Sequence, residues 1–203
     1  MNKPQQPAMP ARSPFDRRQV VKDILTRLPD ALVVSGLGSP SYDVYAAGDR
    51  PGNFYLWGAM GGSTSVALGL ALAQPDKIVL AITGDGEQLM GIGSLATVAV
   101  QQPANLALIV LDNGHFGETG MQRSHASLGA NLTDMARACG IRNSMSLTAS
   151  EGLDALFSSI EARSGTTFAQ LHIEAHEHVR ALPPRDGVFI QNRFRSHLGL
   201  DPF

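Results

Sequence analysis

Two side chains able to bind a divalent cation follow two apolar runs of the sequence. Asp85 follows the run at residues 77–83, and Asn113 follows the run at residues 105–112. If the two runs are neighbouring parallel strands, a carboxylate and an amide oxygen meet at one edge of the sheet. In proteins, Mg²⁺ binds a few such oxygens together with phosphate oxygens. The pair therefore predicts a site for a cation and a phosphate group.

Glycines around both residues favour an anion beside the cation. Asp85 stands between two glycines. Asn113 opens the glycine-rich loop 114–120, and another glycine loop, 58–62, follows the second apolar run of the chain. Backbone N–H groups of glycines approach an anion closely, and a helix beginning after Gly86 directs its positive end toward that anion. The ligand is therefore expected to carry phosphate.

Apolar and helical patterns alternate along the chain, and they must position these residues. Six extended runs are expected at 31–35, 53–57, 77–83, 105–112, 143–147 and 167–174, with helices at 41–47, 62–73, 87–101, 132–139 and 151–163 after an N-terminal helix. The third and fourth runs are almost continuously apolar, as strands covered on both faces are. The alternation predicts an α/β protein, with a doubly wound six-stranded parallel sheet in three α/β/α layers. Such sheets bind ligands at the carboxyl ends of their strands.

Composition excludes several classes of protein. Of the 203 residues, 43% are hydrophobic and 17% are charged, which is typical of a globular domain. The net charge of −2 favours neither nucleic acid nor a membrane as a partner. No apolar run is long enough to span a membrane, and the proline-rich residues 1–14 contain no signal-peptide core. With a single cysteine, Cys139, the chain suits a reducing compartment, so we expect a cytoplasmic protein.

Several stretches together resemble the diphosphate-binding (PP) domain of thiamine-diphosphate-dependent enzymes over roughly residues 30–175. The stretches that carry the resemblance are Asn53–Gly61, Gly84–Gly93, Pro103–Leu106 and Leu111–Gln122. Within this family the chain is most similar to the small subunit of sulfopyruvate decarboxylase and to the matching half of phosphonopyruvate decarboxylase. A Rossmann nucleotide site fits less well. Its motif needs three glycines after the first strand, and only those at positions 36 and 38 are present.

The resemblance implies a site for thiamine diphosphate and Mg²⁺. The side chains of Asp85 and Asn113 and the backbone carbonyl of His115 would bind Mg²⁺. Met60 would hold the cofactor bent, and the carbonyl of Gly58 would accept a hydrogen bond from its aminopyrimidine. The full implied set of cofactor-binding residues is Gly58, Met60, Gly84, Asp85, Gly86, Glu87, Asn113, His115, Phe116 and Gly117. The bent cofactor would act as its own base, attack a small 2-oxo acid and take up the electrons left by loss of CO₂.

Some assignments leave alternatives open. The imidazole of His115 is either a catalytic proton relay or has no role in the reaction, in which case only the backbone carbonyl of His115 takes part in the site. The family usually has a small residue at position 87, and more often a tyrosine and a small residue at positions 116 and 118, so Glu87, Phe116 and Glu118 depart from its pattern. The last two would line the substrate side, so the substrate is expected to differ from sulfopyruvate.

Other basic residues are weaker candidates for ligand binding. Arg123 and Arg50 are candidates for binding an anionic substrate. His172, His176 and His178 alternate along the end of the last strand, either as a metal site or as a solvated strand end.

The resemblance also implies that half of the active site is missing from this chain. In the family, an activating glutamate lies on a separate pyrimidine-binding domain, for which residues 1–203 leave no room. We therefore expect a disordered tail at 1–14, a PP domain at 15–175, and a C-terminal tail at 176–203 docked on a partner subunit. The implied function is the β subunit of a non-oxidative 2-oxo acid decarboxylase. It would be active only with a pyrimidine-domain α subunit, in an α₂β₂ or larger heteromer.

Two alternative functions remain. One is a subunit of another thiamine-diphosphate enzyme, either a carboligase or a 2-oxo acid oxidoreductase. A single cysteine cannot ligate an iron–sulfur cluster, which disfavours the oxidoreductase for this chain. The other is a non-catalytic regulatory module that binds diphosphate.

Overall fold

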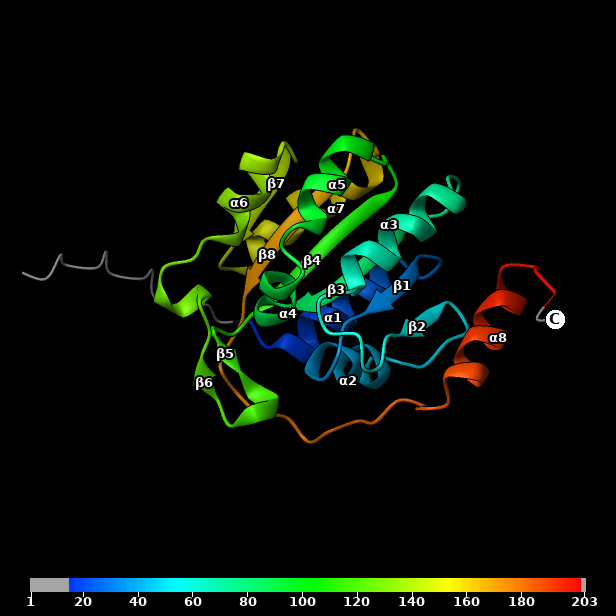
Figure 1. Ribbon diagram of the computed structural model, residues 1–203, viewed down its shortest axis with the longest axis horizontal. Helices are drawn as coiled ribbons and strands as arrows, with labels where there is room; N and C mark the ends of the chain where they lie inside the picture. Colours follow the sequence, from blue (N-terminus) through cyan, green and yellow to red (C-terminus); the bar gives the residue numbers. More distant parts are fainter. Residues whose placement is uncertain (1–14, 202–203) are drawn as a thin grey trace, which may run out of the picture.

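Six parallel strands form the central sheet, in the order β2-β1-β3-β4-β8-β7 (Figure 1). The computed structural model describes residues 15–201, so the tail predicted at 1–14 lies outside the described residues. The strands of this sheet are β1 (Leu32–Ser35), β2 (Asn53–Tyr55), β3 (Val79–Gly84), β4 (Leu106–Asp112), β7 (Asn143–Leu147) and β8 (Thr167–His172). The helices are α1 (Arg17–Arg27), α2 (Ser39–Ala46), α3 (Ser63–Ala73), α4 (Asp85–Met90), α5 (Ser94–Gln101), α6 (Leu132–Cys139), α7 (Leu153–Ala162) and α8 (Gly187–His197). The predicted α/β class and the six-stranded parallel sheet are confirmed.

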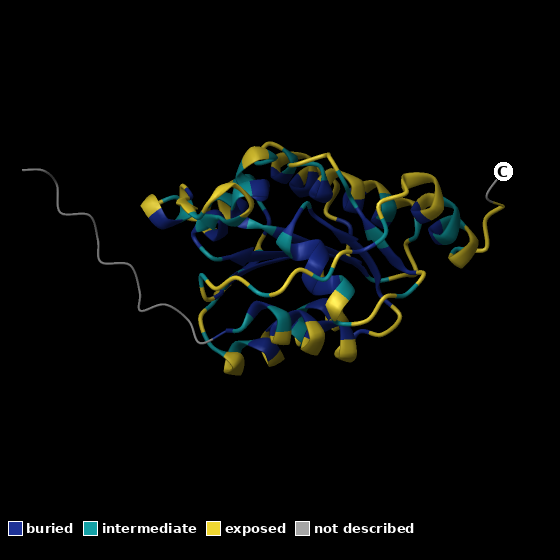
Figure 2. Ribbon diagram, turned by 90° about the horizontal axis from the view of Figure 1, so that it is seen from below, coloured by how far each residue is buried: buried dark blue, intermediate teal, exposed yellow. Residues whose placement is uncertain are grey.

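Helices cover both faces of the sheet, as the three-layer prediction requires. The helices α1, α2 and α7 pack on one face, and α3, α5 and α6 pack on the other. Side chains of β3 alternate between the two cores: Leu80 and Ile82 join the first, and Val79 and Ala81 join the second. Figure 2 shows the strands buried between the helical layers. Burial on both faces is the reason that these strands are visible in the sequence as apolar runs.

The pairing of β3 with β4 brings the candidate ligands to one edge of the sheet. Gly84, the last residue of β3, is paired with Leu111 of β4. Asp85 and Asn113 therefore leave the sheet at the same edge. The connection after β1 runs through α2 on one face, whereas that after β3 runs through α5 on the other. Such diverging connections open a crevice at the strand ends, where α/β proteins bind ligands.

The helix predicted at 87–101 is in fact two helices, so this prediction is wrong. Helix α4 begins at Asp85 and ends at Met90, and α5 begins at Ser94. At Gly91, between them, a Cβ would lie 2.1 Å from the carbonyl oxygen of Gly61. The helix breaks where another backbone segment approaches it closely, at residues with low helix propensity. The other predicted helices and strands are present; α6 and β7 have the predicted bounds, and the ends of the rest are shifted.

The loop after β4 contains a small hairpin that the sequence patterns did not predict. Strand β5 (His115–Phe116) pairs antiparallel with β6 (Gln122–Arg123). A single 3₁₀ turn, Gly117–Thr119, lies between the two strands. The hairpin projects from the edge of the sheet that carries Asp85 (Figure 1).

The C-terminal segment packs on its own chain. Helix α8 lies beside β2 at the edge of the sheet (Figure 1). Phe194 of α8 is buried and meets Phe54 edge to face, with ring centroids 5.5 Å apart. The indole of Trp57 donates a hydrogen bond to the carbonyl of Pro184 (2.8 Å). Docking of the remaining exposed surface on a partner subunit stays a prediction. Among the helices of residues 15–201, none is long and apolar enough to cross a membrane.

Candidate active site

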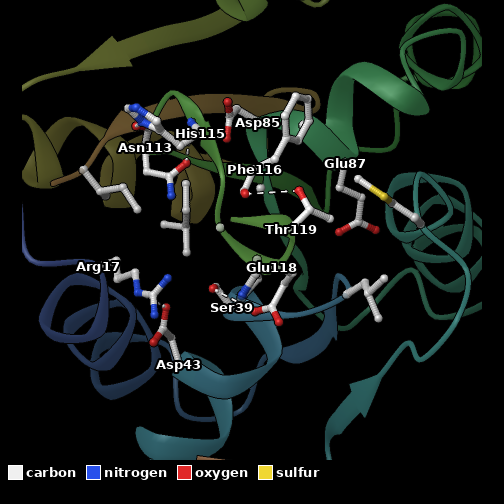
Figure 3. A pocket seen from close by; sticks show the side chains of 18 residues that line it. Arg17, Ser39, Asp43, Asp85, Glu87, Asn113, His115, Phe116, Glu118 and Thr119 are labelled. Atoms are coloured by element: carbon white, nitrogen blue, oxygen red, sulfur yellow. Dashed lines mark hydrogen bonds and ion pairs between the residues drawn. The ribbon is translucent and has the colours of Figure 1, made fainter. Parts of the chain in front are cut away.

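One cavity at the carboxyl edge of the sheet gathers nearly all of the residues predicted to bind the cofactor (Figure 3). Its volume is about 200 Å³. The predicted residues that line it are Met60, Gly84, Asp85, Gly86, Glu87, Asn113, His115, Phe116 and Gly117. Gly58 does not line the cavity, although it lies in the loop of Met60 and has a left-handed φ of 70°. The fold thus joins three loops that are far apart in the sequence.

Asp85 is held in the wall of this cavity as a buried carboxylate. Only 2% of the residue is exposed, and the hydroxyl of Ser124 donates a hydrogen bond to its Oδ2. Burial and, to a smaller extent, the negative charge of Asp112 raise the pKa of Asp85 to about 7, although the hydrogen bond from Ser124 opposes the shift. A cation stabilises the ionised form of such a carboxylate. Asp85 is therefore suited to bind a metal ion.

Asp112, the last residue of β4, is tied in place by three partners. Its Oδ1 accepts a hydrogen bond from the N–H of Gly114 (2.9 Å), and its Oδ2 accepts one from the side chain of Gln170 (2.7 Å). Nδ1 of His172 lies 3.4 Å from the same Oδ2. Burial raises the pKa of Asp112, but the hydrogen bonds from His172 and Gln170 outweigh it, so the pKa is below its ordinary value. Asp112 therefore stays ionised and adds to the negative potential at Asp85.

The loop after β4 turns tightly around Asn113. Its side-chain Oδ1 accepts a hydrogen bond from the N–H of His115 (2.9 Å), and Nδ1 of His115 lies 2.8 Å from the backbone carbonyl of Asn113. An amide oxygen has a second lone pair, which remains available to a cation. Because Nδ1 of His115 is engaged with its own loop, only Nε2 is available to a ligand. A proton-relay role for this imidazole stays a prediction.

The donor set suits a cation that arrives with a phosphate group. In the described part of the chain, no three His, Cys, Asp or Glu side chains gather as a metal site. The histidine metal triad is therefore not formed: His172 lies beside Asp112, whereas the rings of His176 and His178 contact each other. A cation held by Asp85 and Asn113 must take its other ligands from the backbone, water or a bound phosphate. Mg²⁺ accepts this arrangement.

Glu87 lines the cavity with an unpartnered carboxylate. The residue is 4% exposed, and neither oxygen has a hydrogen-bond partner among the described residues. Burial raises its pKa, and the side chains of Thr83 and Ser63 oppose this shift. A Cβ added at Gly36 would lie 1.8 Å from Oε2 of Glu87. The carboxylate is thus directed at the end of β1.

The opposite wall of the cavity comes from residues that the sequence patterns did not identify. Arg17 and Asp43 both line it (Figure 3), with Nε of Arg17 3.2 Å from Oδ2 of Asp43. Phe15 forms a bridge to Ile173 after β8, which brings the start of α1 to this edge of the sheet. No motif marks Arg17, because its position depends on how α1 packs. Ser39 follows the first strand, so the rule for strand ends could have identified it.

Glu118 also belongs to this wall. Oγ of Ser39 donates a hydrogen bond of 3.5 Å to Oε1 of Glu118, and Nη2 of Arg180 lies 3.3 Å from Oε2. A Cβ at Gly38 would lie 2.9 Å from Cγ of Glu118, so the side chain rests directly on the loop after β1. The prediction that Glu118 faces the ligand side is in agreement with this placement.

The two arginines considered as substrate ligands lie outside the cavity. Nε of Arg123 donates a hydrogen bond to Oγ of Ser127 (3.2 Å), and Nη2 of Arg50 donates one to the carbonyl of Ala31 (2.8 Å). Neither arginine lines the cavity. Among the described residues that do, Arg17 is the one arginine or lysine.

Comparison with protein families identifies the domain. The chain matches the family model described as thiamine pyrophosphate enzyme, C-terminal TPP binding domain, over residues 41–171. It is 40% identical over 126 residues to sulfopyruvate decarboxylase subunit beta of Methanocaldococcus jannaschii, which covers 62% of this chain and 66% of the relative. It is 38% identical over 187 residues to sulfopyruvate decarboxylase of Methanosarcina acetivorans, which covers 92% of this chain and 48% of the relative. The chain thus spans only part of the length of these relatives.

The fold has counterparts among solved structures. The thiamine diphosphate-dependent 4-hydroxybenzoylformate decarboxylase of Rhodococcus jostii RHA1 superimposes with a TM-score of 0.71 and 21% sequence identity. The match covers 88% of this chain and 36% of that chain. At this level of identity the likeness shows the fold alone.

Proposed function

Because the chain belongs to the family of thiamine pyrophosphate enzymes and carries their C-terminal TPP-binding domain, we propose that it is the β subunit of a Mg²⁺-dependent 2-oxo acid decarboxylase. The observation that carries the proposal is that Met60, Asp85 and Asn113, from three separate loops, line one cavity. The names of the two sulfopyruvate decarboxylase relatives support this class of reaction.

The residues of the cavity fit the cofactor and its metal. Asp85 and Asn113 would bind Mg²⁺ through their side-chain oxygens, together with the backbone carbonyl of His115. The backbone N–H groups of Gly86 and Glu87 would bind the diphosphate. A side chain at Gly86 would not fit, since a Cβ there would lie 2.4 Å from the ring of Phe116. The lack of a side chain at Gly86 thus lets the ring of Phe116 pack directly on the backbone that begins α4.

Apolar residues of the same cavity would shape the rest of the site. Met60 would hold the cofactor bent. Leu37, Leu111 and Ile173 also line the cavity and would exclude water from the bound cofactor. When bound, thiamine diphosphate supplies the electron sink for the loss of CO₂ from a 2-oxo acid. This chain would bind and orient the cofactor; its own side chains need not take part in bond breaking.

We infer that a second polypeptide completes the site. The relative from Methanocaldococcus jannaschii is named a subunit beta, and the relative from Methanosarcina acetivorans is about twice as long as the part that this chain matches. Both facts support a PP domain, at residues 15–175 here, that works with a pyrimidine-binding domain carried on another chain. The cavity would then lie at the interface of an α/β heteromer.

Two measurements test the proposal. Calorimetric titration of thiamine diphosphate into the native complex, isolated through a tag on this chain, is expected to show tight binding with Mg²⁺ and little without it. Asp85→Ala should weaken the binding by at least about a hundredfold, since it removes a metal ligand. The complex, but not this chain alone, should release CO₂ from a 2-oxo acid. Full turnover by the isolated chain, or unchanged cofactor affinity in Asp85→Ala, would refute the assignment.

A further inference from the structure

The charged side chains of the cofactor cavity are mostly acidic. Among the described residues that line it, the carboxylates belong to Asp43, Asp85, Glu87 and Glu118, against the single guanidinium of Arg17. Arg17 is already paired with Asp43, which also lies 3.3 Å from Arg18. No cation from this chain is therefore left over in the cavity wall to bind a second acidic group of a substrate.

Two of the four carboxylates have roles that keep them from a substrate. Asp85 is the proposed metal ligand, and Asp43 is fully buried between two arginines. Glu87 is also buried and is directed at the end of β1. Glu118 differs from all three, because 39% of its side chain is exposed. It is therefore the carboxylate that a substrate in this cavity would meet.

The fold holds Glu118 across the cavity wall. The residue lies in the 3₁₀ turn between β5 and β6, and its side chain reaches the loop after β1, where it rests on Gly38 and accepts the hydrogen bond from Ser39. Contacts to both loops keep its carboxylate at one place in the wall. Figure 3 shows Glu118 beside Ser39, on the side of the cavity opposite Asp85 and Asn113.

The pairing of Glu118 with Arg180 does not cancel its charge. Both side chains of this pair are well exposed (60% for Arg180), and exposed ion pairs are weak and are screened by solvent. Arg180 lines a neighbouring cavity and not the one that contains Asp85. Burial raises the pKa of the neighbouring Tyr42, and the negative charge of Glu118 raises it further. The positive charge of Arg180 lowers the pKa of Tyr42, but by less than Glu118 raises it. The negative field of Glu118 thus reaches its neighbours.

We propose that Glu118 is a specificity-determining residue that selects 2-oxo acids with an uncharged far end and disfavours those with a second acidic group. The inference rests on the proposed function and names its substrate class. It distinguishes this chain from relatives named for sulfopyruvate, a 2-oxo acid with a sulfonate at its far end. Repulsion between two like charges about 6 Å apart near a protein surface corresponds to about a tenfold preference once solvent screening is included.

A matched pair of substrates isolates the effect of charge. 2-Oxoadipate and 5-nitro-2-oxopentanoate have nearly the same shape and differ by one negative charge, because a nitro group is an uncharged isostere of a carboxylate. With the native complex loaded with thiamine diphosphate and Mg²⁺, kcat/KM for the nitro compound should exceed that for the diacid by about tenfold. Glu118→Gln keeps the size of the side chain and should bring the ratio close to one by lowering KM for the diacid. Arg180→Gln should increase the preference for the nitro compound.

Glu177→Gln is the matched control, because Glu177 lines only the neighbouring cavity and should leave the ratio unchanged. Equal ratios in the wild type and in Glu118→Gln would overturn the proposal. A wild-type preference for the diacid that Arg180→Gln abolishes would also overturn it. If neither compound is decarboxylated, the proposed function fails separately. Calorimetric titration of the same two compounds into the wild type and into Glu118→Gln then decides the role of Glu118. If the two proteins have equal affinities for the diacid, Glu118 does not select against its charge.

Discussion

Ser124 donates a hydrogen bond to the carboxylate of Asp85, which precedes it by 39 residues. The backbone N–H of Ser124 also donates a hydrogen bond to the carbonyl of Gly114 (2.9 Å), so it closes the hairpin loop that begins after Asn113. The loop that carries one proposed metal ligand thus returns to orient the other. Mutual positioning of Asp85 and Asn113 therefore depends on the hairpin as well as on the pairing of β3 with β4.

Ser124→Ala is expected to weaken Mg²⁺-dependent binding of the cofactor by about tenfold, as the loss of a group that orients a metal ligand does. The variant removes the hydroxyl that holds Asp85 and leaves both proposed ligands in place. The measurement is a calorimetric titration of thiamine diphosphate at fixed Mg²⁺. Ser159→Ala is the control, since Ser159 bonds Thr167 away from the cavity and should leave the affinity unchanged. An unaltered affinity in Ser124→Ala would show that Asp85 needs no such support.

Asp85→Asn should stabilise the metal-free protein at high pH. The pKa of Asp85 in the folded state is about 7, above its ordinary value of 3.8. Because the pKa is raised, the folded state binds the proton of Asp85 more tightly than the unfolded state does. The stability gained from this proton is complete below pH 3.8 and is lost as the pH rises through 7. Asp85→Asn removes this loss, so the unfolding free energy of the variant relative to the wild type should increase by about 2–3 kcal/mol between pH 5 and pH 8. Urea unfolding in the presence of EDTA measures it.

Asp112→Asn is the control with the opposite sign. The pKa of Asp112 is lowered, so its ionised form stabilises the fold above its ordinary pKa and loses that effect as the pH falls. The variant should destabilise the protein at neutral pH, by about 1–3 kcal/mol. A stability loss in both variants at pH 8 would contradict the pKa order of the two carboxylates.

Gly91→Ala is expected to displace the loop of Met60 and to lower cofactor affinity. A Cβ at Gly91 would lie 2.1 Å from the backbone oxygen of Gly61, and a backbone atom cannot rotate away as a side chain can. The protein should lose about 1–3 kcal/mol of stability, and the cofactor should bind more weakly. Gly93→Ala is a close control, because a Cβ there meets no atom within 4 Å. Thermal unfolding and cofactor titration of both variants give the comparison.

Asp43→Asn should be strongly destabilising. Asp43 is fully buried, and its carboxylate lies 3.2 Å from Arg17, of which only 7% is exposed. Without its partner the buried guanidinium loses its counter-ion, which costs about 3–5 kcal/mol. Glu161→Gln, which breaks the exposed pair with Arg27, should cost less than about 1 kcal/mol. Urea unfolding curves compare the two variants. An equal loss of unfolding free energy in both would show that burial does not make the pair of Asp43 and Arg17 more stabilising than the exposed pair.

Much of the fold can be predicted from the sequence, because strands buried on both faces must be apolar along their whole length. The run from Leu106 to Asp112 has this pattern, and all seven of its residues are buried. Where the prediction failed, a distant contact was the cause. The helix expected at 87–101 is interrupted because Gly61 lies against Gly91, and no local pattern carries that information. In the C-terminal segment, Phe194 is buried and meets Phe54 of the same chain, and docking of the rest of this segment on a partner stays a prediction.

The same division holds for the candidate site. The sequence by itself determined the family and the pair of Asp85 and Asn113, because glycines and polar residues at strand ends are local patterns. Only the tertiary structure decided which residues surround that pair. Ser124 reaches Asp85, Arg17 reaches the cavity from α1, and Glu118 spans two loops to meet Ser39. Each of these contacts joins segments far apart in the chain, so each depends on the packing of whole elements, which residue spacing does not encode.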